Sequence, residues 1–567
     1  MNLTNVIYKT AAVLFGGIGG ATKGLLNSQM EYGGKLYKFK ILCSIDSDPV
    51  ACHNHDLITG EKTSVLMDLF RKWQYVAWHG HQPPADWREV TAWDLWVSFG
   101  YQVPFFLFTS PPCKGLSGLL PQGKANSDKY QALNFLTVSG LELALQACYE
   151  YGGSVPAIIQ LENVPRITSR GKNLLKQIEK LLKKFGYAVS FRADHNLGKI
   201  GGLAEDRVRF LIMARHEAQI PNSIYYPELK PMQTIGDVIN HLPTPGDTVA
   251  GGPLNRLPRL QWKTWMRLAL INAGGDWRDL NSVDFDNLRV IPESILNREG
   301  KDTTCSTNGF ERVHVLGMIS NPRLNISGNG KSNLYRLQAA DEAAGCITGA
   351  AGPNQGATCI SDPRLVERAG RHPAAYRVVK IDGPAPCVTG TRLGSGALAI
   401  SDPCVNTNLY LDSSGVQEKT TITDPLNKRV FRSNDSSGMV NLFADTECID
   451  VIDAMAVPGD DERGVWVIIA QDGTWHRPLT TYELAMIQSF PQFLPDGRPF
   501  QLEGCSDAKA REYIGNAVPP DAEEDMGNVM LLAAAEAEAG LSFSLTWNQV
   551  WVAPKEDPEI EIQSMLN

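Results

Sequence analysis

The sequence has 567 residues, of which 43% are hydrophobic and 20% are charged, so it has the composition of an ordinary globular protein and is too long for one simple core. It contains no run of about 18 apolar residues, and its first residues lack the regions of a secretory signal, so we expect neither a membrane span nor export. The net charge of −9 argues mildly against a nucleic-acid partner unless part of the surface is basic.

The 11 cysteines are scattered and odd in number, and none forms a C-x-x-C pair. This pattern predicts a reducing, cytoplasmic environment and argues against a disulfide scaffold or a structural zinc. We therefore expect no metal site.

Residues 8–26 have the pattern of a strand, a glycine-rich turn and a helix, with the turn at residues 16–20. Glycines allow close approach of backbone to a ligand, and the helix start offers unpaired N–H groups. The pattern is F-x-G-x-G-G and not the dinucleotide pattern G-x-G-x-x-G. On its own it is more typical of a plain tight turn.

The next two predicted strands each end near an acid. Residues 39–45 are followed by Asp46, in a place where an acid commonly accepts hydrogen bonds from a ribose. Residues 46–49 also fit a helix N-cap, and the two roles are compatible. A short strand over residues 65–69 would place Asp68 at the same crevice.

An apolar run over residues 103–108 ends at Thr109-Ser-Pro-Pro-Cys113. The prolines exclude a helix there, so the sequence predicts a buried strand that delivers a thiol at its carboxyl end. Ligands of open α/β sheets bind at that end, which makes Cys113 a candidate nucleophile. A buried structural cysteine is an equally good interpretation of this stretch alone.

Residues 130–151 and 171–185 have helical spacing, and the basic face of the second is most often simply solvated. The strand predicted over residues 156–161 ends in Glu162-Asn-Val-Pro165. Strands over 187–192 and 207–214 flank a glycine-rich turn at 198–202, and Arg207 and Arg209 alternate, so both can point to one face.

Up to about residue 216 strands and helices alternate, which predicts a doubly wound, mostly parallel sheet. Residues 217–476 are rich in Gly, Pro, Asn, Asp and Ser and contain a two-copy repeat, residues 335–363 and 376–403. We interpret the repeat as two similar strand-turn units in a β-rich recognition domain. A duplicated hairpin without any contact function is an equally good interpretation. A capping box at Thr480 and Glu483 then opens a helix, and residues 515–520 lead into a long helix over 521–539.

In this order the motifs resemble those of the DNA cytosine-5 methyltransferase family. They are F-x-G-x-G-G (15–20), S-P-P-C (110–113), E-N-V (162–164), R-x-R (207–209), R-x-L-T-x-x-E with Q-x-F-P (477–491) and G-N-A-V-P-P (515–520). The resemblance implies an α/β fold, a class I, Rossmann-like doubly wound sheet with an irregular β-rich target-recognition domain. We expect a catalytic domain at 1–216, target recognition at 217–476, and a C-terminal segment, 477–567, that returns to the catalytic domain.

The resemblance also implies a reaction. Cys113 would add to carbon 6 of cytosine so that carbon 5 attacks a methyl donor, and Glu162 would hydrogen-bond ring nitrogen 3. Arg209 would hold the carbonyl oxygen of the base and orient Glu162. Arg207 would steady the loop that carries Cys113 or a nearby phosphate.

The implied donor is S-adenosylmethionine, and the implied partner is duplex DNA with the target base flipped out. We expect a monomer of bacterial or phage origin, acting in the cytoplasm. Eight residues would hold the cofactor: Phe15, Gly17 and Gly19 at its methionine part, Asp46 at the ribose, Asp68 at the adenine, and Pro111, Asn516 and Val518 around it.

The sequence departs from the family at three places. Ser47 replaces an apolar residue that packs on adenine, Glu205 replaces a glutamine, and Lys114 and Leu116 replace Gln and Phe after the cysteine. None of these changes touches Cys113 or Glu162, so we expect activity.

Two other functions use the same fold: an RNA cytosine-5 methyltransferase, which the long middle region disfavours, and a catalytically silent DNA-binding relative, which Cys113 and Glu162 disfavour. The glycine pattern excludes a nicotinamide oxidoreductase. The recognised site, a link to restriction and the base that removes the carbon-5 proton do not follow from the sequence. Basic residues that would face DNA are Arg166, Arg170, Lys172, Arg207, Arg256, Arg259 and Arg392.

Overall fold

The computed structural model describes residues 5–112, 127–271, 279–280, 475–542 and 546–553, and only short segments between 281 and 474. The chain divides into two compact units. The first comprises residues 1–239, 384–390 and 484–567, and the second comprises residues 240–383 and 391–483. The first unit therefore contains both ends of the chain.

The first unit is built on a sheet with the strand order β2-β3-β1-β5-β6-β9-β7, in which β4 also pairs with β3. Strands β4, β3, β1, β5 and β6 run parallel, whereas β9 is antiparallel to both of its neighbours and β2 is antiparallel to β3. This arrangement confirms the predicted doubly wound, mostly parallel sheet. The strands are β1 (Val6–Leu14), β2 (Gln29–Tyr32), β3 (Lys35–Asp46), β4 (Ser64–Leu66), β5 (Phe106–Thr109), β6 (Ile158–Asn163), β7 (Tyr187–Asn196) and β9 (Val208–His216).

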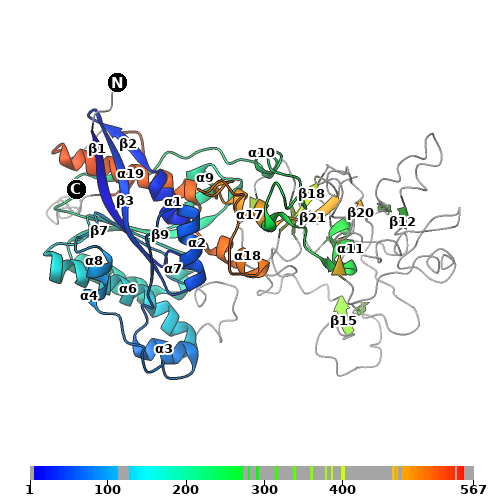
Figure 1. The fold of residues 1–567 in the computed structure, drawn as a ribbon, viewed down its shortest axis with the longest axis horizontal. Helices are drawn as coiled ribbons and strands as arrows, with labels where there is room; N and C mark the ends of the chain where they lie inside the picture. Colours follow the sequence, from blue (N-terminus) through cyan, green and yellow to red (C-terminus); the bar gives the residue numbers. More distant parts are fainter. Residues whose placement is uncertain are drawn as a thin grey trace, which may run out of the picture. The chain divides into compact units, whose positions relative to one another are not determined.

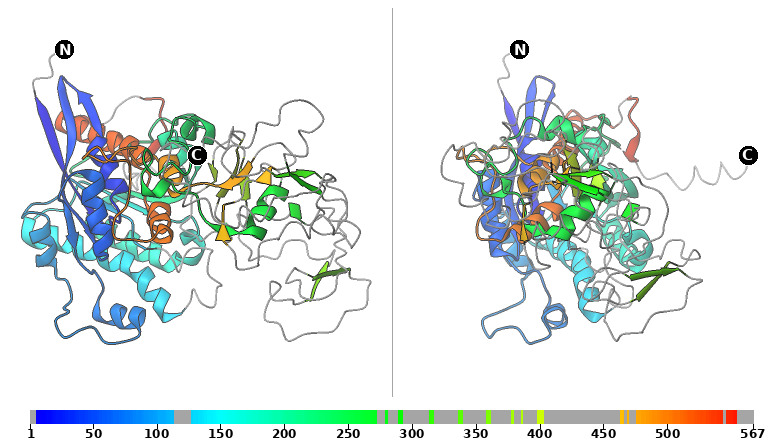
Figure 2. Two further views of the ribbon diagram at one scale, coloured as in Figure 1. Left: turned by 45° about the vertical axis from the view of Figure 1, so that its right-hand side comes forward. Right: turned by 90° about the vertical axis from the view of Figure 1, so that its right-hand side faces the viewer.

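Helices cover both faces of this sheet (Figures 1 and 2), which is why β5 and β6 are buried along their whole length. One apolar cluster joins the sheet to α4, α6 and α8, and the other joins it to α1 and α19. The helices are α1 (Gly20–Asn27), α2 (Pro49–Thr59), α3 (Lys72–His79), α4 (Ala92–Ser98), α6 (Asp128–Gly152), α7 (Ile167–Arg170), α8 (Lys172–Lys184), α9 (Leu197–Gly201), α10 (Ile235–Ile239), α18 (Asp507–Asn516) and α19 (Pro520–Glu538).

One local prediction is wrong. Residues 197–201 form the short helix α9 where a glycine-rich turn was expected, because the Asn196 side chain accepts hydrogen bonds from the backbone N–H groups of Gly198 and Lys199. Residues 70–100 are rich in Trp and their sequence favours neither helix nor strand; in the structure this Trp-rich stretch contains α3 and α4. In the same unit, β8 (Glu205–Asp206) pairs with β17 (Ala385–Pro386), and β10 (Ile224–Tyr225) pairs with β22 (Val550–Val552).

The described part of the second unit contains α11 (Trp262–Leu270) and a sheet of the order β12-β13-β20-β21-β18-β16. Its strands are β12 (Arg289–Pro292), β13 (Val313–Leu316), β16 (Arg377–Val379), β18 (Leu398–Asp402), β20 (Ile468–Ile469) and β21 (Trp475–Pro478), and β11 (Leu260–Gln261) pairs with β19 (Arg463–Gly464). The two repeat copies form equivalent parallel pairs: β14 (Arg336–Ala339) with β15 (Thr358–Ser361), and β16 with β18. This agrees with two similar strand-turn units.

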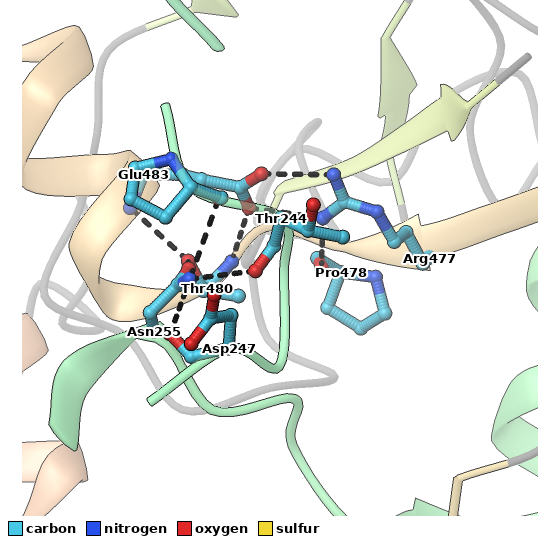
Figure 3. A network of polar contacts seen from close by, with 8 residues as sticks. Thr244, Asp247, Asn255, Arg477, Pro478, Thr480 and Glu483 are labelled. Carbon is cyan, nitrogen blue, oxygen red and sulfur yellow. Dashed lines mark hydrogen bonds and ion pairs between the residues drawn. The ribbon is translucent and has the colours of Figure 1, made fainter. Parts of the chain in front are cut away.

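A buried polar network holds the start of α17 (Thr481–Ile487) in this unit (Figure 3). Thr480 and Glu483 form the predicted capping box: the N–H of Thr480 donates to Glu483 Oε2 at 2.7 Å, and the N–H of Glu483 donates to Thr480 Oγ1 at 3.1 Å. Glu483 also accepts two hydrogen bonds from Arg477, at 2.9 and 2.8 Å. Asn255 accepts from the Thr480 hydroxyl and donates to the carbonyl of Thr244.

Candidate active site

Asp46 at the end of β3 holds the glycine turn in place. Its Oδ2 accepts from the N–H of Gly17, and its Oδ1 accepts from the N–H of Asp48, both at 2.9 Å. Burial raises the pKa of this carboxyl, and the backbone donors oppose that effect. The cap of α2 is Asp48, which accepts from Val50 and Ala51, so Asp46 itself remains at the crevice.

The turn between β1 and α1 has unusual backbone angles. Phe15 has φ 59° although it is not a glycine, and Gly17 and Gly19 have φ 53° and 90°. Strained residues of this kind cluster at ligand-binding sites. A Cβ built on Gly17 would meet no atom of the described residues within 4 Å, so with respect to these residues the turn opens onto free space. The Phe15 ring lies against Gly140 of α6.

Asp68 lies just after β4 and is already engaged by protein donors. Its Oδ1 accepts from the N–H of Phe70 at 3.0 Å, and its Oδ2 accepts from Trp87 Nε1 at 3.3 Å. Trp87 is half-buried and packs on Tyr75, with ring centroids 5.1 Å apart. Ser47 is exposed.

Glu162 lies at the carboxyl end of β6 between two donors. Ser110, at the end of neighbouring β5, donates its hydroxyl to Glu162 Oε2 at 2.8 Å. Arg209 of β9 lies with its Nε 2.9 Å from Glu162 Oε1. The side chains of Glu162 and Arg209 are only 9% and 12% exposed, so the Glu162 carboxyl group is largely shielded from solvent. The predicted pairing of Arg209 with Glu162 is present.

Cys113 lies outside the described residues, as do Lys114 and Leu116. Pro111 is buried, and the described residues stop at Pro112, one residue before the thiol. Ser110 is three residues before Cys113 in sequence.

Arg207 is fully buried, so it does not face DNA phosphate, which corrects that part of the prediction. It donates to the carbonyls of Gly515 at 3.1 Å and Ala517 at 2.8 Å and so steadies the C-terminal segment. The loop that carries Cys113, which Arg207 was also expected to steady, lies outside the described residues. Arg207 also pairs with Glu205, which is 0% exposed, at 3.3 Å. The acid that replaces the family's glutamine is thus the buried partner of Arg207. Arg392 lies outside the described residues.

The C-terminal segment reaches the glycine turn, as the sequence predicted. A Cβ on Gly20 would collide with the carbonyl oxygen of Val518, which shows that the backbones touch. Val518 is buried, Asn516 is exposed at the end of α18, and the Tyr513 hydroxyl donates to Asp48 at 2.6 Å. The structure therefore brings together Phe15, Gly17, Gly19, Asp46, Asn516 and Val518 from the two ends of the chain.

Ser110 and Trp87 had no role in the predictions from the sequence. Ser110 belongs to the S-P-P-C motif, and its distance in sequence from Glu162 conceals the contact. Trp87 lies in the Trp-rich stretch, which has no periodic pattern. Pairing of β5 with β6 would have indicated Ser110, since strand ends of a parallel pair adjoin.

The sheet order, the reversed β9 and the residues at the strand ends define a class I methyltransferase fold. Residues 81–258 match the family model of C-5 cytosine-specific DNA methylases. No curated protein matches the sequence. The family match implies a methyl donor and a nucleic-acid substrate that carries cytosine.

Several solved structures are similar to the chain. They include the Entamoeba histolytica methyltransferase EhMeth (11% identity, 92% of this chain and 98% of that chain covered, TM-score 0.39). A putative DNA modification methyltransferase encoded within a prophage of E. coli (12%, 92% and 98%, 0.39) and the S. pombe methyltransferase Dnmt2 (12%, 94% and 100%, 0.36) are also similar. In the described part of the chain, no helix is both long enough and apolar enough to cross a membrane.

Proposed function

We propose that the protein transfers a methyl group from S-adenosylmethionine to carbon 5 of a flipped-out cytosine in duplex DNA, through a covalent adduct with Cys113. The observation that carries the proposal is the cluster of Ser110, Glu162 and Arg209. It places a held carboxyl group at the carboxyl end of the strand next to the one that leads to Cys113. Such a group is what a thiol addition to cytosine requires on the other side of the ring.

The chemistry follows from these groups. The Cys113 thiolate forms a bond to carbon 6 while Glu162 donates a hydrogen bond or proton to ring nitrogen 3, which stabilises the electron pair that moves into the ring. Carbon 5 is then nucleophilic and would take up the methyl group that bound S-adenosylmethionine would supply. Loss of the carbon-5 proton to a base expels the thiolate and restores the aromatic ring, and a proton transferred to ring nitrogen 3 returns to Glu162. Arg209 and Ser110 orient Glu162.

The residues around the glycine turn fit a bound S-adenosylmethionine, which supplies an electrophilic methyl group. The free space at Gly17 leaves room for a ligand against the backbone. Asp46 uses one lone pair of each oxygen on Gly17 and Asp48, and each oxygen has a second for a ribose hydroxyl. Asp68 would face the adenine, and Asn516 and Val518 would border the site from the C-terminal segment.

We assign target recognition to the region 217–476, most of which falls in the second unit, and the catalytic steps to residues 1–216 with the segment 477–567. A base inside a duplex is not accessible to Cys113, so the target must leave the stack. Phosphate contacts from basic side chains would supply affinity in spite of the net charge of −9.

The test is incubation with duplex DNA of mixed sequence and methyl-labelled S-adenosylmethionine, followed by digestion to nucleosides and base-resolution sequencing. Cys113→Ala and Glu162→Gln serve as variants, and an RNA reaction runs in parallel. We expect label in 5-methylcytosine at one short motif with the wild type and none with Cys113→Ala. Label in RNA alone would replace DNA by RNA as the substrate. DNA binding without any label would indicate a silent relative.

A further inference from the structure

Glu523 is a carboxyl group buried where three parts of the candidate site meet. It is 0% exposed and lies on α19, which begins two residues after Val518. Its Oε2 accepts a hydrogen bond from Gln160 Nε2 at 2.8 Å, and Gln160 lies on β6 two residues before Glu162. A Cβ on Gly24 of α1, the helix after the glycine turn, would collide with Glu523 Cβ.

Among the residues that the structure describes, no cation lies beside Glu523. None of the ion pairs within the described parts of the chain includes Glu523, and the neighbouring charged group is Glu162, which repels a second negative charge. Burial raises the pKa of Glu523 well above its usual value; the hydrogen bond from Gln160 opposes this effect, and Glu162 adds to it. A buried carboxylate that no cation compensates is costly, so the group takes up a proton.

Two oxygens in this place lack a hydrogen-bond partner among the described residues: Gln160 Oε1 and Glu523 Oε1. Both are acceptors if Glu523 is ionised, and two acceptors cannot satisfy each other. A neutral carboxylic acid has one O–H donor. A proton on Glu523 Oε1, donated to Gln160 Oε1, therefore satisfies both oxygens and closes a ring with the hydrogen bond already present.

We propose that Glu523 is a positioning residue, a neutral carboxylic acid that joins Gln160 by two reciprocal hydrogen bonds and thereby fixes β6 and Glu162 against α19. The proposal rests on the proposed function only in naming Glu162 as the group that benefits. Residues 160 and 162 share a face of the strand, so a displacement of Gln160 moves the Glu162 carboxyl. Because Glu523 is protonated, no second negative charge lies near Glu162.

The first test does not depend on activity. Infrared difference spectra between the wild type and Glu523→Gln, near neutral pH in H₂O and D₂O, report the C=O stretch of a protonated carboxyl, which a carboxylate lacks. We expect this band in the wild type and its loss in Glu523→Gln. The matched control is Glu524→Gln, on the same helix and only half-buried, which should leave the band intact. A wild type without the band would overturn the proposal.

The second test measures kcat and KM for methyl transfer to DNA. Glu523→Gln and the exchanged pair Gln160→Glu/Glu523→Gln keep two reciprocal hydrogen bonds, so both should stay within about threefold of the wild type. Glu523→Leu leaves Gln160 unpaired and should lower kcat by about tenfold or more with little change in KM. If Glu523→Leu does not fold, the exchanged pair decides, and a loss of its activity contradicts the proposal.

The two failures are distinguishable. Absence of methyl transfer by the wild type refutes the proposed function, whereas the infrared band still decides whether Glu523 is a neutral acid. Methyl transfer by Glu523→Leu at the wild-type rate refutes the positioning role alone.

Discussion

At the scale of single residues, Glu162 has one donor for each oxygen. The guanidinium of Arg209 brings a full charge, and the hydroxyl of Ser110 brings a dipole that can rotate. Hydrogen bonds to a charged group contribute more than those between neutral groups. The two donors also fix the carboxyl plane, which decides where its hydrogen bond points.

Ser110→Ala tests this arrangement. Loss of one hydrogen bond to a carboxyl costs roughly 1.5–3 kcal/mol, so we expect kcat for methyl transfer to fall by about tenfold or more. KM for S-adenosylmethionine should change little, since Ser110 faces Glu162. Ser98→Ala, which removes a hydroxyl bonded to the Asp94 carbonyl on α4, should have no effect on kcat. A normal kcat in Ser110→Ala would show that Arg209 alone orients Glu162.

A buried histidine makes the stability of the first unit depend on pH. His195 is 0% exposed, its Nδ1 lies 2.7 Å from the Tyr226 hydroxyl, and its ring also packs on Trp551. Burial, with a smaller effect of Arg192 that Asp194 opposes, lowers the pKa of His195 to about 4.

The unfolded chain therefore binds a proton at His195 near pH 6.5, and the folded chain does so only near pH 4. The free energy of unfolding should fall as the pH drops through this window, by up to about 3 kcal/mol at about 1.4 kcal/mol per pKa unit. Thermal unfolding at a series of pH values measures the slope, and His195→Gln should reduce it. An unchanged slope in His195→Gln would assign the effect to other groups.

At the scale of elements, two ion pairs of the same kind contribute differently to the free energy of unfolding because one is buried and the other is exposed. Arg477 and Glu483 are 1% and 2% exposed, whereas Lys183 and Glu179 on α8 are 64% and 42% exposed. Removal of one partner from a buried pair leaves an uncompensated charge, and an exposed pair is screened by water.

Glu483→Gln should therefore lower the free energy of unfolding of the second unit by about 3–5 kcal/mol. Lys183→Ala should change that of the first unit by less than about 0.5 kcal/mol. Hydrogen exchange of residues 475–487 and 172–184 measures the two effects separately. If both variants lost the same amount of hydrogen-exchange protection, burial would not determine how much each ion pair contributes to stability.

The elements that could be predicted from the sequence are those that depend on residues close together in the chain. The apolar runs before Asp46, Cys113 and Glu162 predicted strands and placed polar groups at their ends, and the capping box at Thr480 was readable in four residues. Contacts between distant segments were not readable. Arg207 binds carbonyls some 300 residues away, and Glu523 stands in an acidic stretch, Glu523-Glu-Asp525, that is typical of an exposed helix face. Its burial depends on the packing of α19 against α1 and β6.

At the scale of the whole molecule, the first unit needs the C-terminal segment to complete its core. Met526, Met530 and Leu531 of α19 and Trp551 of β22 belong to the apolar cluster on one face of the sheet. Each such buried side chain contributes roughly 1.5–3 kcal/mol. Without them the sheet would expose that face.

A chain cut after residue 483 should therefore be insoluble or bind hydrophobic dyes when expressed alone. Co-expression of residues 484–567 as a separate chain should restore soluble material that contains both fragments. Recovery by size-exclusion chromatography is the measurement. A soluble, cooperatively unfolding fragment 1–483 would show that the face is covered in another way.

The contact of Val518 and α19 with the glycine turn also sets an order in time. The ribosome makes Gly17 and Asp46 more than 450 residues before Val518, so the candidate cofactor site stays incomplete through almost the entire synthesis of the chain. A nascent chain has one uncovered face of the sheet during this interval, which makes it a client for chaperones. If the proposed function is correct, growing chains acquire the capacity for methyl transfer late, only after residues 217–476 have been made.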